Sequence, residues 1–223
     1  MEKIEKKKSI KEGIKTFFKE IFQYPLYLLI HPIGAWEGFK YEKKGKTWVA
    51  IFYSIMMIFA VVIQKTTSGF LTGLNVGKKF NMLSTVSIIV LAIIVATIAN
   101  WCITTISDGK GKIKDIFKVI GYSFFPFVWI SLFATLLGNF VVENEVVYVI
   151  FFNTLAIILT GYLIFFGLQG IHEYGLLKNI LTLIGTIVGI VIIVFTALLF
   201  VFIIQQVWGW IVAIYQEIKV RYF

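Results

Sequence analysis

The chain has 223 residues and a net charge of +9, and 59% of its residues are hydrophobic. Its mean hydropathy is +0.88. The apolar content exceeds the ~45–50% usual in soluble domains, which excludes an ordinary soluble protein. The lysines crowd the N-terminal segment and the ends of apolar stretches, where anionic headgroups would attract them, and no motif for nucleic-acid recognition accompanies them. The single Cys102 excludes an intrachain disulfide.

An amphipathic helix is predicted before the first apolar stretch. Apolar residues recur at helical spacing from Ile10 to Phe22, and charged residues occupy much of the remaining surface. We expect this helix to lie on the cytoplasmic face of the membrane, but a helix that docks on a protein partner has the same pattern. The side chains expected at the membrane surface are Lys11, Lys15, Phe17, Phe18, Lys19 and Phe22.

Two prolines divide the segment that follows. Pro25 is expected to interrupt the amphipathic helix, and Pro32 is expected to end a short apolar piece, Leu26–His31, that cannot cross a bilayer. From there the chain is expected to continue along the membrane surface to the lysines before the first span, with apolar contacts from Ile33, Trp36 and Phe39.

Five apolar stretches then follow, and none carries an acidic or basic residue in its interior. Each approaches or exceeds the ~20 residues that a helix needs to cross about 30 Å of hydrocarbon. The predicted fold is an all-α integral membrane protein, a five-helix transmembrane bundle preceded by an N-terminal amphipathic interfacial helix. The expected units are an N-terminal segment, a transmembrane domain and a short tail, at residues 1–46, 47–215 and 216–223, with spans at 47–64, 82–106, 119–142, 146–169 and 180–204.

The distribution of lysine and arginine predicts the orientation. Sixteen of these 21 residues fall in the N-terminal segment and the second and fourth loops, and five fall on the other side. Because the richer side belongs in the cytoplasm, we expect the N-terminus inside and the C-terminus outside.

Small residues and a proline indicate structural roles within the spans. Pro126 follows Gly121 and Tyr122 in the third span; its missing donor releases the Tyr122 carbonyl, which the Ser123 hydroxyl or a neighbouring helix could satisfy. Gly185 and Gly189 form a GxxxG pattern that permits close helix packing, within the chain or between chains.

Apolar character continues beyond the fifth span to Tyr215. A single helix over that length would be too long for one bilayer, so it either projects outward or bends near Gln205, Gln206 and Gly209, and we expect the bend.

Two polar turns are candidate contact sites for a cytoplasmic partner. The first is Asp108, Gly109, Lys110, Gly111 and Lys112, where glycines permit a tight reversal, although a plain solvated turn would look the same. The second holds His172 and Glu173, which we expect to be solvated.

The residue patterns of the common catalytic and metal sites are missing from the sequence. The motifs HExxH, CxxC and GxSxG do not occur, and no pair of carboxylates lies inside the spans. We therefore expect no catalytic residue, no cofactor and no metal ion, and we expect the protein not to be an enzyme.

Several segments taken together resemble the Yip1 family of five-span membrane proteins. They are 24–25 with 31–36, then Asn100 and Trp101 running into the 108–112 turn, then 121–126. The His-Pro and Asp-Gly-Lys-Gly segments are similar to the bacterial branch. Eukaryotic members bind Rab GTPases, but the aspartate-aromatic-Gly-Pro-aromatic segment typical of their N-terminal region is missing here.

The resemblance implies a non-enzymatic accessory or scaffold protein in the bacterial cytoplasmic membrane. Some bacterial relatives occur alongside ABC-type exporters, so the expected partners are membrane lipids and the permease, ATPase or membrane-fusion subunit of such a complex, with no nucleic acid. A homo-oligomer is possible. A small homo-oligomeric permease or channel is the first alternative, because the spans contain polar residues and the glycine pair; a lipid-organising protein is the second, because of the cationic N-terminal segment.

Overall fold

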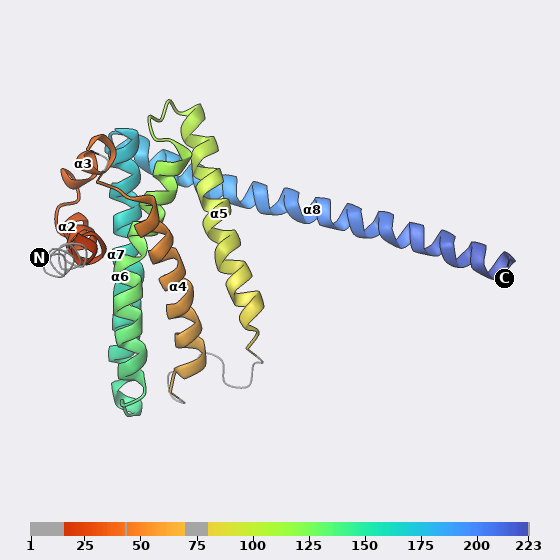
Figure 1. The fold of residues 1–223 in the computed structure, drawn as a ribbon, viewed down its shortest axis with the longest axis horizontal. Helices are drawn as coiled ribbons and strands as arrows, with labels where there is room; N and C mark the ends of the chain where they lie inside the picture. Colours follow the sequence, from red (N-terminus) through yellow and green to blue (C-terminus); the bar gives the residue numbers. More distant parts are fainter. Residues whose placement is uncertain (1–15, 43, 70–79, 223) are drawn as a thin grey trace, which may run out of the picture.

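The computed structural model describes residues 16–42, 44–69 and 80–222, and the regular structure in these ranges is helical (Figure 1). Three short elements come first: the π-helical turn η1 (Lys19–Gln23), α2 (Tyr24–Ile30) and α3 (Ala35–Tyr41). The long helices are α4 (Thr47–Thr67), α5 (Met82–Ile106), α6 (Ile113–Gly138), α7 (Val146–His172, after the 3-10 turn η2, Glu143–Glu145) and α8 (Leu176–Tyr222). These five are long and apolar enough to cross a membrane, which confirms the predicted helical membrane fold.

Helix α6 forms the centre of the bundle and is its most buried span. It packs against α4 on one side and α7 on the other. Gly121 makes the approach to α4 possible, because a Cβ atom there would lie 2.6 Å from the Cβ of Ala50. The neighbouring Tyr122 is buried, and its hydroxyl accepts a hydrogen bond from the main-chain N–H of Lys46 at 3.0 Å. Both residues singled out in the sequence therefore join α6 to α4.

Pro126 lies inside α6, and the helix continues on both sides of it. The Ser123 hydroxyl donates to the carbonyl of Val119 at 2.7 Å. It does not bond the Tyr122 carbonyl that the proline releases, so that part of the prediction is wrong. The reason is geometric: a serine hydroxyl in a helix reaches the carbonyl four residues back most easily.

The N-terminal helix is not interrupted at Pro25, contrary to the prediction. Gln23 and Tyr24 both keep right-handed helical dihedrals, and η1 runs directly into α2 with Pro25 in its first turn, a position that proline tolerates. The π-helical turn accommodates the ring. The second prediction is confirmed, because α2 ends at Ile30, just before Pro32.

The predicted surface helix is described only from Thr16 onward, so Lys11 and Lys15 lie outside the described residues. Phe17, Phe18 and Lys19 are exposed, in keeping with a membrane-surface position. Phe22 instead turns toward the bundle and packs on Trp129 of α6, with ring centres 5.0 Å apart.

Trp36 and Phe39 of α3 are buried, which corrects the prediction that they lie along the membrane surface. Two glycines of α7 leave room for the indole. A Cβ at Gly170 would lie 2.5 Å from the Cβ of Trp36, and one at Gly167 would lie 3.1 Å from its ring. The third predicted residue, Ile33, is 76% exposed. Helix α3 is therefore inserted against α7 rather than resting on the surface.

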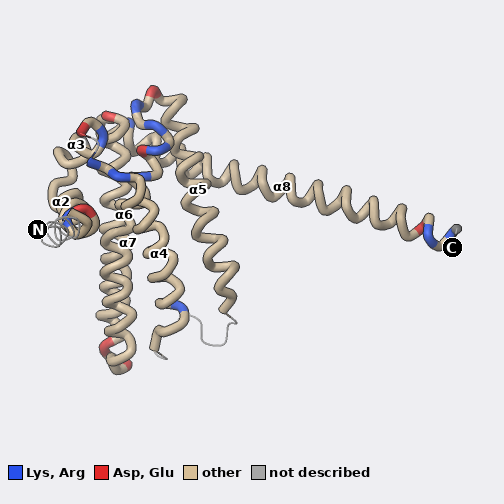
Figure 2. The backbone as a smooth tube through the Cα atoms, in the orientation of Figure 1, with Lys and Arg blue, Asp and Glu red and all other residues tan. Residues whose placement is uncertain are grey.

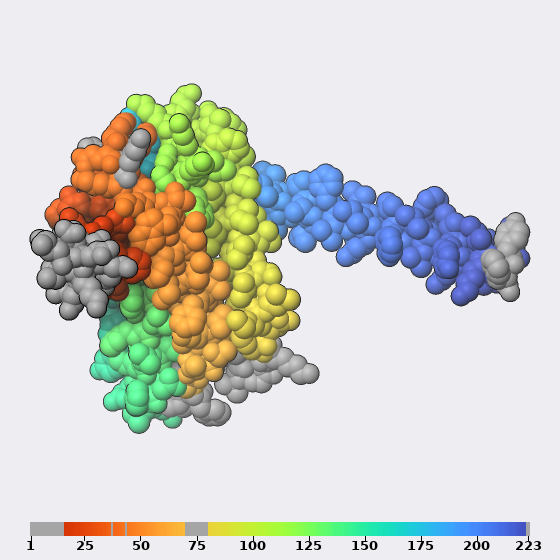
Figure 3. Space-filling view, viewed as in Figure 1, coloured from red at the N-terminus to blue at the C-terminus, as the bar shows by residue number. Residues whose placement is uncertain are grey.

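Helix α8 runs without a break from Leu176 to Tyr222, so the predicted bend near Gly209 is wrong. A single glycine costs a helix only about 1 kcal/mol and does not end it. The helix leaves the other spans sideways (Figures 1 and 3), and from Val194 to Arg221 every side chain is exposed.

The first turns of α8 pack on α5 through the GxxxG pattern, so these glycines serve a contact within the chain. A Cβ at Gly185 would lie 3.1 Å from Ile103, and one at Gly189 would lie 3.6 Å from the Cβ of Ala99. The Asn100 side chain donates to the hydroxyl of Thr186 at 3.0 Å in the same interface.

Candidate functional site

Charged side chains gather at one end of the bundle. Figure 2 shows basic and acidic positions together around α3 and the turn between α5 and α6, whereas the turn between α6 and α7 at the opposite end carries acidic positions. We call the first end the lysine-rich end; its ion pairs involve Lys40, Lys44, Lys46, Lys110 and Lys118.

The two predicted contact turns lie together at this end. Residues 107–112 connect α5 to α6, and residues 173–175 connect α7 to α8. Contacts between them join residues 107–112 to residues 172–174, and we call this group the turn cluster. The sequence separates its two halves by about sixty residues, so only the tertiary structure makes them one site.

Glycines at two positions let the first turn close over the second. A Cβ at Gly109 would lie 2.5 Å from His172 Nδ1 and 2.6 Å from the Tyr174 hydroxyl, and one at Gly111 would lie 2.7 Å from His172 Cε1. The left-handed dihedral of the turn belongs to Asp108, with φ of 54°. Both glycines are therefore needed for close approach, and the prediction that they supply a positive φ is corrected.

His172 is 2% exposed, which overturns the prediction that it is solvated. Helix α7 ends at this residue, and Glu173 then takes a left-handed dihedral, with φ of 57°, that folds the chain back beneath the first turn. His172 Nδ1 accepts a hydrogen bond from the N–H of Gly111 at 3.2 Å. This bond assigns the imidazole proton to Nε2, which finds no partner in the part of the chain that the structure describes.

Glu173 links three segments through its carboxylate. Lys110 of the first turn and the Tyr41 hydroxyl both donate to it at short range, and Lys40 donates from 3.1 Å. These hydrogen bonds, led by that of Lys110, lower the pKa of Glu173 from 4.5 to about 2. The same contact raises the pKa of Lys110. Lys40 also donates to the carbonyl of Ile171 at 2.9 Å, which fixes α3 to the end of α7.

Tyr174, Lys40 and Tyr41 belong to the site but were not predicted. Tyr174 stacks on His172 with ring centres 5.3 Å apart, and its hydroxyl reaches the carbonyl of Ser107 at 3.1 Å. The aromatic residue directly after the His-Glu pair was the only local signal. Nothing in the sequence indicated that α3 would lie beside this turn.

The chemistry available here is that of a charged surface on a fixed backbone. Asp108, Lys110 and Lys112 are exposed, while the histidine and tyrosine beneath them are buried. Across residues 16–42, 44–69 and 80–222, no three His, Cys, Asp or Glu side chains lie close enough together to hold a metal ion. The arrangement is suited to contacts with another macromolecule.

The chain matches a known protein family. The profile of the Yip1 domain matches residues 26–215, which include α4 to α7, α8 as far as residue 215, and the turn cluster. No curated protein and no solved structure matches the chain. The chain is a multi-pass membrane protein that belongs to the Yip1 family.

Proposed function

We propose that this chain is a non-enzymatic accessory subunit that helps to assemble or stabilise a bacterial ABC-type export complex. It would sit in the cytoplasmic membrane with its lysine-rich end in the cytoplasm. Sixteen of the 21 basic residues fall on the side that includes this end, which supports that orientation. The proposal goes beyond family membership. It is supported by the resemblance of the His31-Pro32 and 108–112 segments to the bacterial branch of the family.

Helix α8 is the observation that carries the proposal. At about 1.5 Å per residue its 47 residues extend about 70 Å, more than twice the ~30 Å of a bilayer's hydrocarbon core. Beyond its contacts with α5 and α7 it offers an apolar surface that the described residues of the chain leave uncovered. Such a surface is suited to lateral packing against the spans of another membrane protein.

The turn cluster supplies a second contact, outside the membrane. Its exposed charges stand on a backbone fixed by the hydrogen bonds of His172, Glu173 and Tyr174. A surface ordered before binding loses little entropy when a partner docks on it. The ATPase subunit of an exporter is the partner expected at this position.

Polar residues in the spans and the glycine pair suggested a channel, and in the structure they form contacts between helices. Asn100 bonds Thr186, and both glycines of the GxxxG pattern face α5. These groups hold α8 to α5, so no specific observation favours a channel as a second function.

A photo-crosslinking experiment in native membranes tests the proposal. A photoreactive amino acid replaces Lys110 in the turn cluster or Phe202 on α8, and crosslinked proteins are identified by mass spectrometry. We expect an ABC ATPase from Lys110 and a permease from Phe202. The matched control position is Phe140, which is 86% exposed at the opposite end of the bundle.

Affinity purification of the tagged wild-type chain in a mild detergent provides the second measurement. Stoichiometric recovery of an ATPase and a permease supports the proposal. If both crosslinking positions yield only lipid, and the purified chain carries no other protein, the accessory role is wrong.

A further inference from the structure

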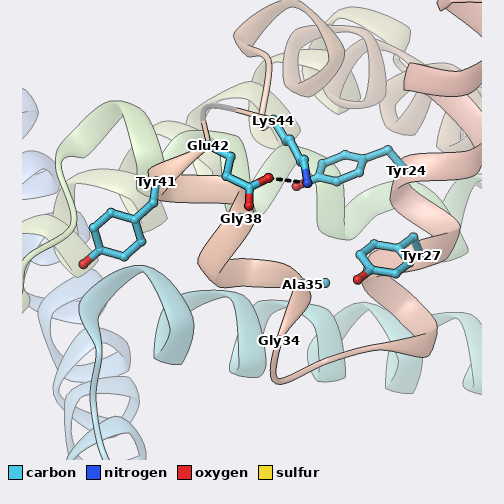
Figure 4. A pocket seen from close by; sticks show the side chains of 8 residues that line it. All are labelled: Tyr24, Tyr27, Gly34, Ala35, Gly38, Tyr41, Glu42 and Lys44. Atoms are coloured by element: carbon cyan, nitrogen blue, oxygen red, sulfur yellow. Dashed lines mark ion pairs between the residues drawn. The ribbon is translucent and has the colours of Figure 1, made fainter.

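A cavity of about 310 Å³ lies between α2 and α3 at the lysine-rich end, and one of its lining residues, Tyr41, also bonds Glu173 of the turn cluster. Figure 4 shows Tyr24 and Tyr27 of α2 directed toward the backbone of α3, with Glu42 and Lys44 above them. Gly34 leaves its floor open, because a Cβ there would meet nothing within 4 Å. The small residues thus make room, and polar side chains line it.

Tyr24 presents a hydroxyl without a partner at this cavity. Its oxygen is buried and makes no hydrogen bond to any part of the chain that the structure describes. The ring is held from two sides, stacked on Phe39 at 6.3 Å and edge-on to Tyr122 at 6.0 Å. Burial raises the pKa of Tyr24, so the hydroxyl stays protonated and can donate. A buried donor with no partner costs stability, which a bound acceptor would restore.

A cation and an anion face each other at the same cavity. Lys44 and Glu42 form an ion pair and are both more than half exposed, so either can exchange its partner for a ligand. The carboxylate of Glu42 already holds a primary ammonium, that of Lys44. A ligand that carried both a phosphate and a primary amine could take over both halves of the pair.

Exposed apolar side chains lie close in the sequence to the cavity residues Tyr24, Tyr27 and Gly34. Leu26 and Ile30 of α2 are 46% and 63% exposed, and Ile33 is exposed in the turn that follows. They suit the acyl chains of a lipid whose headgroup occupies the cavity, because α2 belongs to the predicted interfacial segment.

We propose that the cavity between α2 and α3 binds the headgroup of a zwitterionic phospholipid with a primary amine, of which phosphatidylethanolamine is the simplest. Lys44 and the Tyr24 hydroxyl bind the phosphate, and Glu42 binds the ammonium group. The site does not depend on the proposed role in an export complex, and either proposal can fail alone.

The size of the cavity is consistent with a headgroup alone. At about 30 Å³ per water its volume corresponds to about ten water molecules, and phosphoethanolamine has about eight non-hydrogen atoms. Phosphatidylglycerol lacks the ammonium group that Glu42 requires. Phosphatidylcholine has a quaternary nitrogen, which cannot donate a hydrogen bond to the carboxylate.

Lipid titration of the purified full-length protein tests the site. The protein in dodecylmaltoside is titrated with dioleoyl phosphatidylethanolamine, phosphatidylglycerol, phosphatidylcholine or inorganic phosphate, and native mass spectrometry measures the bound fraction. We expect phosphatidylethanolamine to bind about tenfold more tightly than the other two lipids, a difference of about 1.4 kcal/mol. Inorganic phosphate at the same concentration should not displace it.

Three substitutions each remove one recognition group: Tyr24→Phe, Glu42→Gln and Lys44→Gln. Each should weaken phosphatidylethanolamine binding about tenfold. Glu42→Gln and Lys44→Gln change exposed side chains, so they leave the fold intact even if Tyr24→Phe does not. The matched controls are Lys65→Gln and Tyr148→Phe, exposed residues away from the cavity, which should bind like the wild type.

Each other outcome overturns the proposal in its own way. Equal or tighter binding of phosphatidylglycerol means a cationic patch that attracts anionic lipids. Equal binding of phosphatidylcholine removes the role of the primary amine. Displacement by inorganic phosphate means a free-phosphate site. Unchanged binding in all three variants means that the lipid lies elsewhere on the protein.

Discussion

The hydroxyl of Tyr53 in α4 donates a hydrogen bond to the main-chain carbonyl of Ile21 at 2.6 Å. Ile21 lies four residues before Pro25, so its carbonyl is the one that would bond residue 25 in a regular α-helix, and proline has no N–H to offer. Both Tyr53 and Ile21 are buried. The tyrosine thus gives this buried carbonyl a partner close to the proline and ties the N-terminal helix to the first span.

Substituting Tyr53→Phe should destabilise the protein by about 1–3 kcal/mol, because it leaves a buried carbonyl without a partner. Thermal unfolding in detergent, followed by circular dichroism, measures the change. Tyr148→Phe is the matched control, since Tyr148 is 61% exposed and should tolerate the loss of its hydroxyl. Equal unfolding midpoints for the two variants would contradict the assigned role of Tyr53.

Two helical glycines should respond in opposite ways to the same substitution. Gly121→Ala places a Cβ atom 2.6 Å from that of Ala50, so overpacking should cost about 1–3 kcal/mol. A Cβ atom at Gly161 would meet nothing within 4 Å, so Gly161→Ala should stabilise the protein by up to about 1 kcal/mol through its higher helix propensity. The same unfolding assay compares them. A stabilising Gly121→Ala would show that α4 and α6 do not approach as closely as described.

The turn cluster offers a similar pair. Gly109→Ala should cost about 1–3 kcal/mol locally, because the new atom collides with His172 and Tyr174. Gly175 lies in the other turn of the cluster, and a Cβ atom there would meet nothing within 4 Å. The free energy of unfolding of Gly175→Ala should therefore stay within about 0.5 kcal/mol of the wild-type value. Hydrogen exchange at the Gly111 amide, which bonds His172, reports the difference. Equal protection in both variants would argue against the packed turn.

The carboxylate of Glu173 predicts a pH dependence of stability. Its pKa in the folded protein lies near 2, below the ordinary value of 4.5. A lowered pKa stabilises the fold fully above about pH 4.5, and this contribution is lost as the pH falls toward 2. Glu173→Gln should therefore unfold at a lower temperature than the wild type at pH 7, and the two should converge near pH 2.

The difference at pH 7 should be small, because solvent screens a carboxylate that is 32% exposed. Glu217→Gln is the matched control: Glu217 is an exposed residue of α8 that pairs with Arg221 at 3.9 Å. If the unfolding temperatures of the wild type and Glu173→Gln differ by the same amount at all pH values, the ionised carboxylate does not explain the effect of the substitution.

The sequence alone determined the membrane class and the presence of five long apolar helices. A run of about twenty apolar residues has few stable alternatives to a membrane helix, because its backbone groups must bond one another in lipid. The prediction for the second span matches α5, at residues 82–106. The end of α2 before Pro32 was predictable for the same kind of local reason.

Only the tertiary structure decided what depends on neighbours distant in the chain. Trp36 is buried because two glycines of α7 admit it, and the N-terminal helix is tied to α4 because Tyr53 bonds the carbonyl of Ile21. His172 is buried because Gly109 and Gly111 close over it. Apolar periodicity shows which residues leave water, but it does not distinguish lipid from protein as the surrounding medium. That distinction requires packing between segments, and packing also created the turn cluster and the cavity between α2 and α3.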